Sequence, residues 1–263
     1  MRSTSIIRLF LVAGALAAWE AVRRLDLVHA ILLASPSEIA RAAFDAGDPL
    51  VTAFRTTFVE IVIAIAVSWT LGVGAGLAIG MNRRLGDFFA PILSSAFAVP
   101  KIMFYPLLLV WLGIGPVSKI AFAVFTSFFT IALTTMDAVR AVDTRVVPVV
   151  RSFGASRATI VARVLVPLAL PGIVSGLRIG TALIVIGVIV AEMLASFNGI
   201  GFWISSNRSS FNTPEVYLGI VLALACSITI SSILSRIERR FGAWREAERA
   251  REGVDARTGG GTF

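Results

Sequence analysis

The stretch FVEIVIAIAVSWTLGVGAGLAI, Phe58–Ile79, runs for 22 residues with one charged side chain, Glu60. About 20 consecutive apolar residues, rising about 1.5 Å each, are enough for a helix to cross the hydrocarbon core of a bilayer. Backbone polar groups inside that core must be satisfied within the segment, as a helix does. The stretch therefore predicts a transmembrane helix and favours an all-α membrane fold.

The composition of the whole chain supports lipid as its solvent. Of the 263 residues, 57% are hydrophobic and 15% are charged, whereas soluble domains average roughly 25% charged residues. The lone cysteine, Cys226, lies in an apolar run and excludes a disulfide framework. These features indicate a polytopic membrane protein.

Five further apolar segments have lengths that fit a bilayer. They are Ile6–Val22, Phe89–Leu112, Ser118–Met136, Gly172–Ala195 and Tyr217–Leu234. The sequence thus predicts a bundle of six spans. The first 18 residues also fit a cleaved signal peptide, but the charge distribution favours an uncleaved first span. Between the first two spans, Pro36–Arg41 is expected to begin a short external helix capped by Ser35 or Ser37.

Basic residues set the expected orientation. With both termini in the cytoplasm, 17 of the 24 Lys and Arg residues lie on the cytoplasmic side, as the positive-inside rule requires. The net charge of +8 is therefore explained by topology, and we expect no nucleic-acid partner.

Glycines recur every fourth residue in the second and fifth spans, so that each series shares one helix face. The residues are Gly72, Gly76 and Gly80, and Gly172, Gly176 and Gly180. Small residues on one face allow close packing between helices, which we favour over a functional hinge. A nucleotide-binding turn is disfavoured because no soluble strand precedes these glycines.

Two prolines interrupt the third apolar segment. Pro100 and Pro106 flank Lys101 and Tyr105, and proline removes a backbone donor from a helix. The pattern fits either a kink that suits neighbouring helices or a discontinuous segment that lines a solute pathway. In the second case Lys101 would attract an anionic solute; alternatively, its ammonium reaches the outer surface.

Glu192 is the carboxylate with the most apolar flanks, and it lies near the outer end of the fifth span. A hydrogen-bonded structural role near an outer gate is favoured over direct contact with solute or protons. His29 is the only histidine, so a histidine-based metal site or catalytic relay is not expected, nor is a cofactor. No phosphate-binding loop is present either, so an ATPase would have to be a separate chain.

The longest predicted cytoplasmic loop contains RSFGASRATIVARVLVPLALP, residues 151–171. Gly154 is expected to break the chain, a flanking serine to begin a short helix, and Pro167 and Pro171 to end that helix before the fifth span. Apolar residues give the helix one apolar face, but its arginines form no single stripe. The segment fits a helix docking into a partner protein or a basic helix held by anionic lipid.

The motif Gly154-Ala155-Ser156, with Pro167 thirteen residues after the glycine, resembles the cytoplasmic "EAA" loop of binding-protein-dependent ABC transporter permeases. The chain departs from this pattern at Pro148-Val149-Val150, where Glu-Ala-Ala would stand. Other motifs resemble the nitrate, sulfonate, taurine and bicarbonate branch. These are Trp111–Gly115 with Ser118–Ile120, Arg140–Asp143, Leu177–Ile179, and Ala191–Leu194 with Gly199–Gly201.

The resemblance covers roughly residues 35–240 and implies a type I importer permease in a bacterial cytoplasmic membrane. In that family the loop is a coupling helix that docks into a separate ATPase. The implied partners are two ATPase copies, a second copy of the chain and an external or periplasmic solute-binding protein, working by alternating access. The candidate coupling residues are Arg151, Gly154, Ala155, Ser156, Arg157, Ile160, Arg163 and Pro167.

We expect residues 1–50 to hold the first span and external segment, 51–241 the permease core with its loop at about 138–171, and 242–263 a flexible tail. The candidate pathway residues are Pro100, Lys101, Tyr105 and Glu192. The chain itself would be non-catalytic and would carry a small anionic or sulfonate-like solute. The alternatives are a membrane anchor or a secondary transporter, and the latter predicts mid-membrane ionisable residues, which are scarce here.

Overall fold

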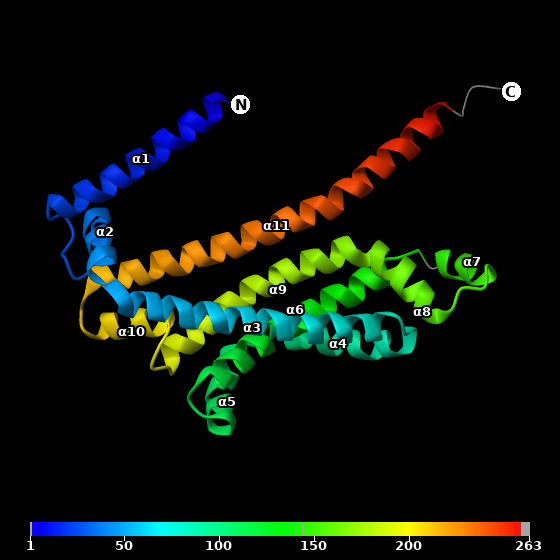
Figure 1. Ribbon diagram of the computed structural model, residues 1–263, viewed down its shortest axis with the longest axis horizontal. Helices are drawn as coiled ribbons and strands as arrows, with labels where there is room; N and C mark the ends of the chain where they lie inside the picture. Colours follow the sequence, from blue (N-terminus) through cyan, green and yellow to red (C-terminus); the bar gives the residue numbers. More distant parts are fainter. Residues whose placement is uncertain (1, 144, 259–263) are drawn as a thin grey trace.

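Three long helices lying side by side form the centre of the molecule: α3 (Gly47–Gly80), α6 (Pro116–Arg140) and α9 (Val166–Leu194) (Figure 1). The computed structural model describes residues 2–143 and 145–258, without the side chains of residues 2–6, 9, 157 and 237–258. Within these limits the chain is helical and contains no strand. The described part of the protein therefore has the predicted all-α fold.

The short helix expected to begin at Pro36 forms as predicted. It is α2 (Pro36–Asp45), and Ser35 is its N-cap. The Ser35 hydroxyl accepts from the Glu38 N–H at 3.2 Å, and the Glu38 carboxylate accepts from the Ser35 N–H at 2.8 Å, which is a capping box. Glu20 of α1 (Arg2–Arg24) accepts from the Ser37 hydroxyl at 2.7 Å. This contact joins α1 to α2, while the rest of α1 extends away from the bundle (Figure 1).

Four described helical stretches are long and apolar enough to cross a membrane. They are Gly47–Gly80, Pro116–Arg140, Ala158–Leu194 and Thr213–Arg236, and they contain the second, fourth, fifth and sixth predicted spans. The last of them opens α11 (Thr213–Thr258). The first predicted span lies in α1, where some side chains are outside the described residues. The total of six spans and the orientation of the termini therefore stay predictions.

The third predicted span is broken. It consists of α4 (Arg83–Ala98), a 3-10 turn at Lys101–Phe104 (η1) and α5 (Tyr105–Leu112), and its two parts meet at 88°. Val99 is extended, with ψ 132°, because the ring of the following proline disfavours helical backbone in the residue before it. The two prolines thus mark a sharp break rather than a shallow kink.

The prediction that Pro167 and Pro171 end a helix before the fifth span is wrong. A π-helical turn at Val161–Leu165 (η2) joins α8 (Arg157–Ile160) to α9, and both prolines lie within α9. The Val166 N–H bonds to the Val161 carbonyl, five residues back. This wider turn lies just before Pro167, where a proline ring would otherwise crowd the preceding turn. The fifth span is therefore continuous from Ala158 to Leu194.

Two polar stretches of the chain are also largely helical. The Asn-, Ser- and Gly-rich stretch at 196–214 contains α10 (Ile200–Ser209), which buries Ile200 and Ile204 against the bundle. The predicted tail, 242–263, is helical as the end of α11 as far as Thr258, and residues 259–263 lie outside the described part of the chain. The polar composition of 196–214 gives little sign of a helix in sequence, because only a few apolar residues, among them Ile200 and Ile204, anchor α10.

Candidate solute site and coupling loop

Both glycine series face α6. A Cβ at Gly76 of α3 would lie 2.5 Å from Thr135 Cβ and 2.6 Å from the Ala132 carbonyl oxygen, and one at Gly172 of α9 would lie 2.6 Å from Ala138 Cβ. Gly72, Gly80, Gly176 and Gly180 make similarly close approaches to α6. Hydrogen atoms in place of side chains bring α3 and α9 close to the central helix.

A cavity of about 340 Å³ lies where the broken segment meets α6 and α9. Its lining residues are Phe97, Lys101, Ile102, Phe122, Thr126, Leu183, Ile186, Gly187 and Val190. They come from both sides of the break, from the N-terminal half of α6 and from α9. The cavity is apolar apart from one ammonium group and one hydroxyl group, which are the kinds of group that fix the orientation of a small ligand.

Lys101 supplies the single charged group of the cavity wall. Its ammonium donates to the Phe97 carbonyl oxygen at 3.1 Å and lies 5.3 Å from the Phe97 ring centroid and 6.0 Å from that of Phe129. Among the described residues no carboxylate forms an ion pair with it. A cation so placed, against aromatic faces, can pair with an anionic group that enters the cavity.

The other pathway candidates take different positions. Pro100 sits at the break directly before Lys101. Tyr105 is 1% exposed and packs against Phe122, and its hydroxyl donates to the Ala191 carbonyl oxygen at 3.1 Å. Tyr105 therefore ties the broken segment to α9 and does not line the cavity. Glu192 is also absent from the cavity wall.

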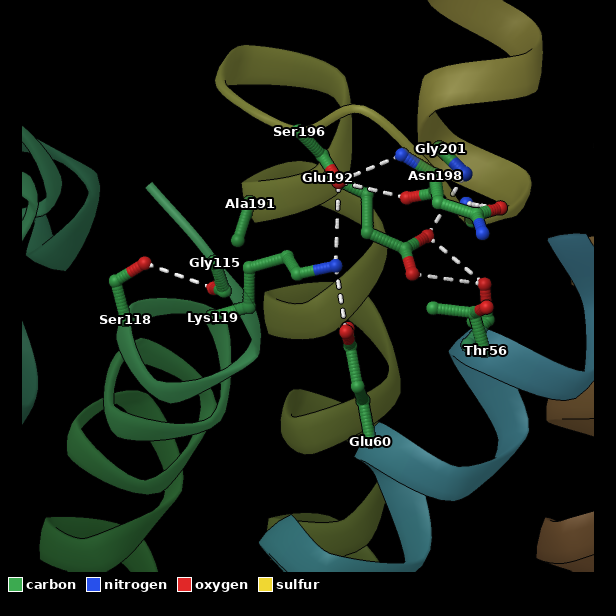
Figure 2. Close-up of polar contacts among 12 residues, drawn as sticks. Thr56, Glu60, Gly115, Ser118, Lys119, Ala191, Glu192, Ser196, Asn198 and Gly201 are labelled. Carbon is green, nitrogen blue, oxygen red and sulfur yellow. Dashed lines mark hydrogen bonds and ion pairs between the residues drawn. The ribbon is translucent and has the colours of Figure 1, made fainter. Parts of the chain in front are cut away.

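Glu192 instead belongs to a buried polar cluster where α3, α6 and α9 meet at the end of the bundle remote from α8 (Figure 2). Its carboxylate accepts from the Thr57 hydroxyl at 2.8 Å and from the Gly201 N–H at 2.8 Å. Beside it, Lys119 pairs with Glu60 at 2.5 Å, and each of these side chains is 3% exposed. The cluster therefore joins three spans by charge and hydrogen bonds away from solvent.

The coupling-loop candidates gather at the opposite end of the bundle, around α7 (Val146–Ser152) and α8. Gly154 has φ 81°, a left-handed conformation that suits glycine, and Ser156 caps α8 by accepting from the Thr159 N–H at 3.2 Å. Ile160 is buried, Ala155 lies just before α8, and Pro167 lies in the first turn of α9. Arg151 and Arg163 are exposed. The side chain of Arg157 lies outside the described residues.

Several residues of these sites did not stand out in the sequence. Phe153 is 86% exposed at the loop tip, and an exposed aromatic side chain on a loop is one signal of a covered surface. Thr57 meets Glu192, and Lys119 meets Glu60, only in the folded structure. The phenylalanines and aliphatic residues of the cavity look like ordinary lipid-facing residues in sequence. Within the described part of the chain, no group of His, Cys, Asp and Glu could hold a metal ion.

Comparison with known proteins places the chain among transport permeases. Residues 68–243 match the family model described as "Binding-protein-dependent transport system inner membrane component". The chain is 27% identical to the taurine transport system permease protein TauC of Escherichia coli, over 87% of this chain and 86% of that protein. It is 28% identical to the putative aliphatic sulfonates transport permease protein SsuC of Bacillus subtilis, over 91% of this chain and 87% of that protein.

The fold also has a counterpart of known structure. A chain of the MetNI methionine ABC transporter, in an inward-facing conformation, superposes with a TM-score of 0.64 and 21% sequence identity. The match covers 73% of this chain and 95% of that chain, and it shows a shared permease fold. The family match covers most of the bundle, including the loop at Gly154 and the polar cluster residues on α6 and α9. The chain therefore belongs to the binding-protein-dependent transport system inner membrane component family, the permeases of ABC transporters.

Proposed function

We propose that this chain is the permease subunit of an ATP-driven importer in a bacterial inner membrane and carries a small anionic or sulfonate-like solute. Two copies of the chain would work with two copies of a separate ATPase and with an external solute-binding protein. The observation that carries the proposal is the cavity beside the helix break, with Lys101 as its charged group. Family membership supports the transport role.

The chemistry of the cavity supports the solute class. A single ammonium favours one negative charge, and the aromatic and aliphatic walls favour a short apolar body attached to it. The relatives named for taurine and for aliphatic sulfonates transport compounds of this kind, by their names. Transferred to this chain, these names support a sulfonate or a similarly small organic anion.

The shape of the loop supports coupling to an ATPase. Its left-handed glycine, exposed Phe153 and exposed arginines form a projecting tip at one end of the bundle (Figure 1). An exposed apolar side chain in a segment that also carries exposed arginines suits a partner with an apolar cleft and an acidic rim. The segment from Gly154 to Arg163 would transmit movement of the ATPase to α9.

The coupling proposal predicts loss of ATP-dependent uptake when the loop is altered. Replacing Gly154 with proline forces φ to about −65° in place of 81°, which redirects α8. Replacing Arg163 with glutamate reverses a charge at the exposed surface. We expect copurification with the ATPase subunit of the transporter to fall about tenfold or more in both variants. Arg208→Glu, on the outer helix α10, is the matched control and should copurify normally.

The outcome against coupling is unchanged association and unchanged ATP-driven uptake in both loop variants. The chain should be expressed to wild-type levels in each case, because Arg163 and Gly154 are both exposed, and the backbone strain at Gly154 is confined to the loop. A loss of association in the Arg208 control would point to general damage to the complex.

The solute proposal predicts that the charge of Lys101 sets transport. In proteoliposomes containing the assembled transporter, with taurine as the probe, Lys101→Met should lower uptake about tenfold or more, because the anion loses its counter-charge. Lys101→Arg keeps the charge and should retain most of the uptake. Uptake by the Lys101→Met variant equal to that of wild type would contradict a solute path beside Lys101. If the wild-type transporter does not take up taurine, the same comparison is made with ethanesulfonate and with nitrate.

A further inference from the structure

Residues 196–201, which link α9 to α10 and include the first two residues of α10, lie directly against the carboxylate of Glu192. A Cβ on Gly201 would come within 2.6 Å of Glu192 Cβ, and a Cβ on Gly199, whose φ is 109°, would overlap the Glu192 carboxylate itself. Glycine at these two positions thus permits the backbone to approach a buried acid more closely than any other residue would allow. Two glycines in one short segment thus make this close approach to Glu192 possible.

Thr57 connects this segment to a different span. Its hydroxyl donates toward Glu192, with oxygen–oxygen distances of 2.8 and 2.9 Å, and it accepts from the Ile200 N–H at 2.8 Å. Thr57 is fully buried and lies on α3, while Glu192 lies on α9 and Ile200 begins α10. One hydroxyl group therefore joins three helices.

Lys119 holds the same segment from the other side. Besides pairing with Glu60, its ammonium donates to the Ser196 hydroxyl at 3.2 Å, and that hydroxyl donates to the Asn198 carbonyl oxygen at 2.6 Å (Figure 2). The segment is thus tied to α6 at its start and to α3 at its end. Asn198 and Gly199 also line an outer hollow of about 490 Å³ together with Asp48 and Trp203.

We propose that Glu192 and Thr57 are positioning residues that form a hydrogen-bonded latch, which holds the segment 196–201 and the start of α10 closed over the outer ends of α3 and α9. The Thr57 hydroxyl and the Glu192 carboxylate accept from the buried N–H groups of Ile200 and Gly201. Without these acceptors the two N–H groups would be unsatisfied, so the hydrogen bonds and the closed position of the segment are lost together. The part that the latch plays in admitting solute rests on the proposed function. The latch itself does not.

Cysteine labelling tests the latch without any solute. The single natural cysteine, Cys226, is replaced by alanine, and Ile200, which is 1% exposed, is replaced by cysteine in the full-length chain. The rate of reaction with a membrane-impermeant maleimide in intact membranes then reports how often the latch opens. In a parallel background, Phe197→Cys, at a position 79% exposed, reports access that does not depend on the latch.

Two pairs of variants separate hydrogen bonding from packing. Glu192→Leu and Thr57→Val keep side-chain volume but remove the hydrogen bonds, and each should raise the labelling rate at position 200 about tenfold or more. Glu192→Gln and Thr57→Ser keep groups that accept from Gly201 and Ile200, and each should leave the rate within about twofold of the background. Labelling at position 197 should be unchanged in all four.

Slow labelling of Ile200→Cys in both the leucine and the valine variants would overturn the proposal, since packing alone would then hold the segment. Equal acceleration by glutamine and leucine at position 192 would also overturn it, because a group that still makes the hydrogen bonds would have failed to keep the latch. Two separate sites carry the test, so failure of one variant to fold leaves the other to decide. Taurine uptake measured on the same variants shows separately whether transport depends on the latch.

Discussion

Replacing Lys119 with methionine is expected to destabilise the protein by about 3–5 kcal/mol. The substitution leaves Glu60 without its counter-charge in a position where its side chain is 3% exposed. An isolated charge inside a bundle is far more costly than the pair, since the pair's attraction offsets much of the cost of removing water from both groups. The free energy of unfolding, measured by denaturant titration in detergent micelles, checks this value.

The double variant Glu60→Leu with Lys119→Met tests whether the cost comes from the unpaired charge. Removing both charges leaves an apolar pair of similar volume, and we expect its free energy of unfolding to return to within about 1–2 kcal/mol of wild type. Lys101→Met is the matched control, because Lys101 is the chain's only other lysine and forms no ion pair with a described carboxylate. An effect of Lys119→Met no larger than that of Lys101→Met would contradict the buried pair.

A single methyl group added to one face of α3 is expected to disrupt the bundle, whereas the same group on another face is expected to be tolerated. In Gly76→Ala the new Cβ would meet Thr135 Cβ at 2.5 Å and the Ala132 carbonyl oxygen at 2.6 Å, so α3 must move away from α6. Such overpacking costs about 1–3 kcal/mol. In Gly74→Ala nothing lies within 4 Å of the new Cβ, and alanine favours helix over glycine by about 0.5–1 kcal/mol.

Thermal unfolding of the two purified variants, followed by size-exclusion chromatography in detergent, measures the difference. The midpoint should fall by several degrees for Gly76→Ala and should stay level or rise for Gly74→Ala. A similar midpoint for both variants would show that α3 does not depend on its close approach to α6.

Local chemistry explains which parts of the fold could be predicted from sequence. Ser35 and Glu38 form a capping box, and Pro36 occupies the first helical position; all three are neighbours in the chain, so the start of α2 was predicted correctly. Long apolar runs similarly predict spans, because the bilayer sets one length for all of them. The break at Pro100 was predicted as one of two alternatives, since a proline pattern shows that a helix is interrupted but not by what angle.

Features that depend on distant or unusual partners were not predictable. Lys119 of α6 pairs with Glu60 of α3, and no local pattern in either apolar segment indicates which residue of the other segment is its partner. The sequence around Thr57 does not distinguish it from other helical threonines, because its partner, the Ile200 N–H, is distant in the chain. Pro167 was predicted to end a helix because that is what proline does in an ordinary α-helical turn; the wider turn ahead of it removes the conflict.

The irregular turn before α9 has a mechanical consequence. The chain changes direction sharply at the π-helical turn Val161–Leu165, between α8 and α9 (Figure 1). Beyond that turn, the 29 residues of α9 form a helix of about 44 Å, which exceeds the roughly 30 Å of a bilayer's hydrocarbon core. Four residues in the half of α9 remote from the turn, Leu183, Ile186, Gly187 and Val190, are wall residues of the cavity. Under the proposed coupling, the turn is the joint through which a movement of α8 would reach the cavity wall.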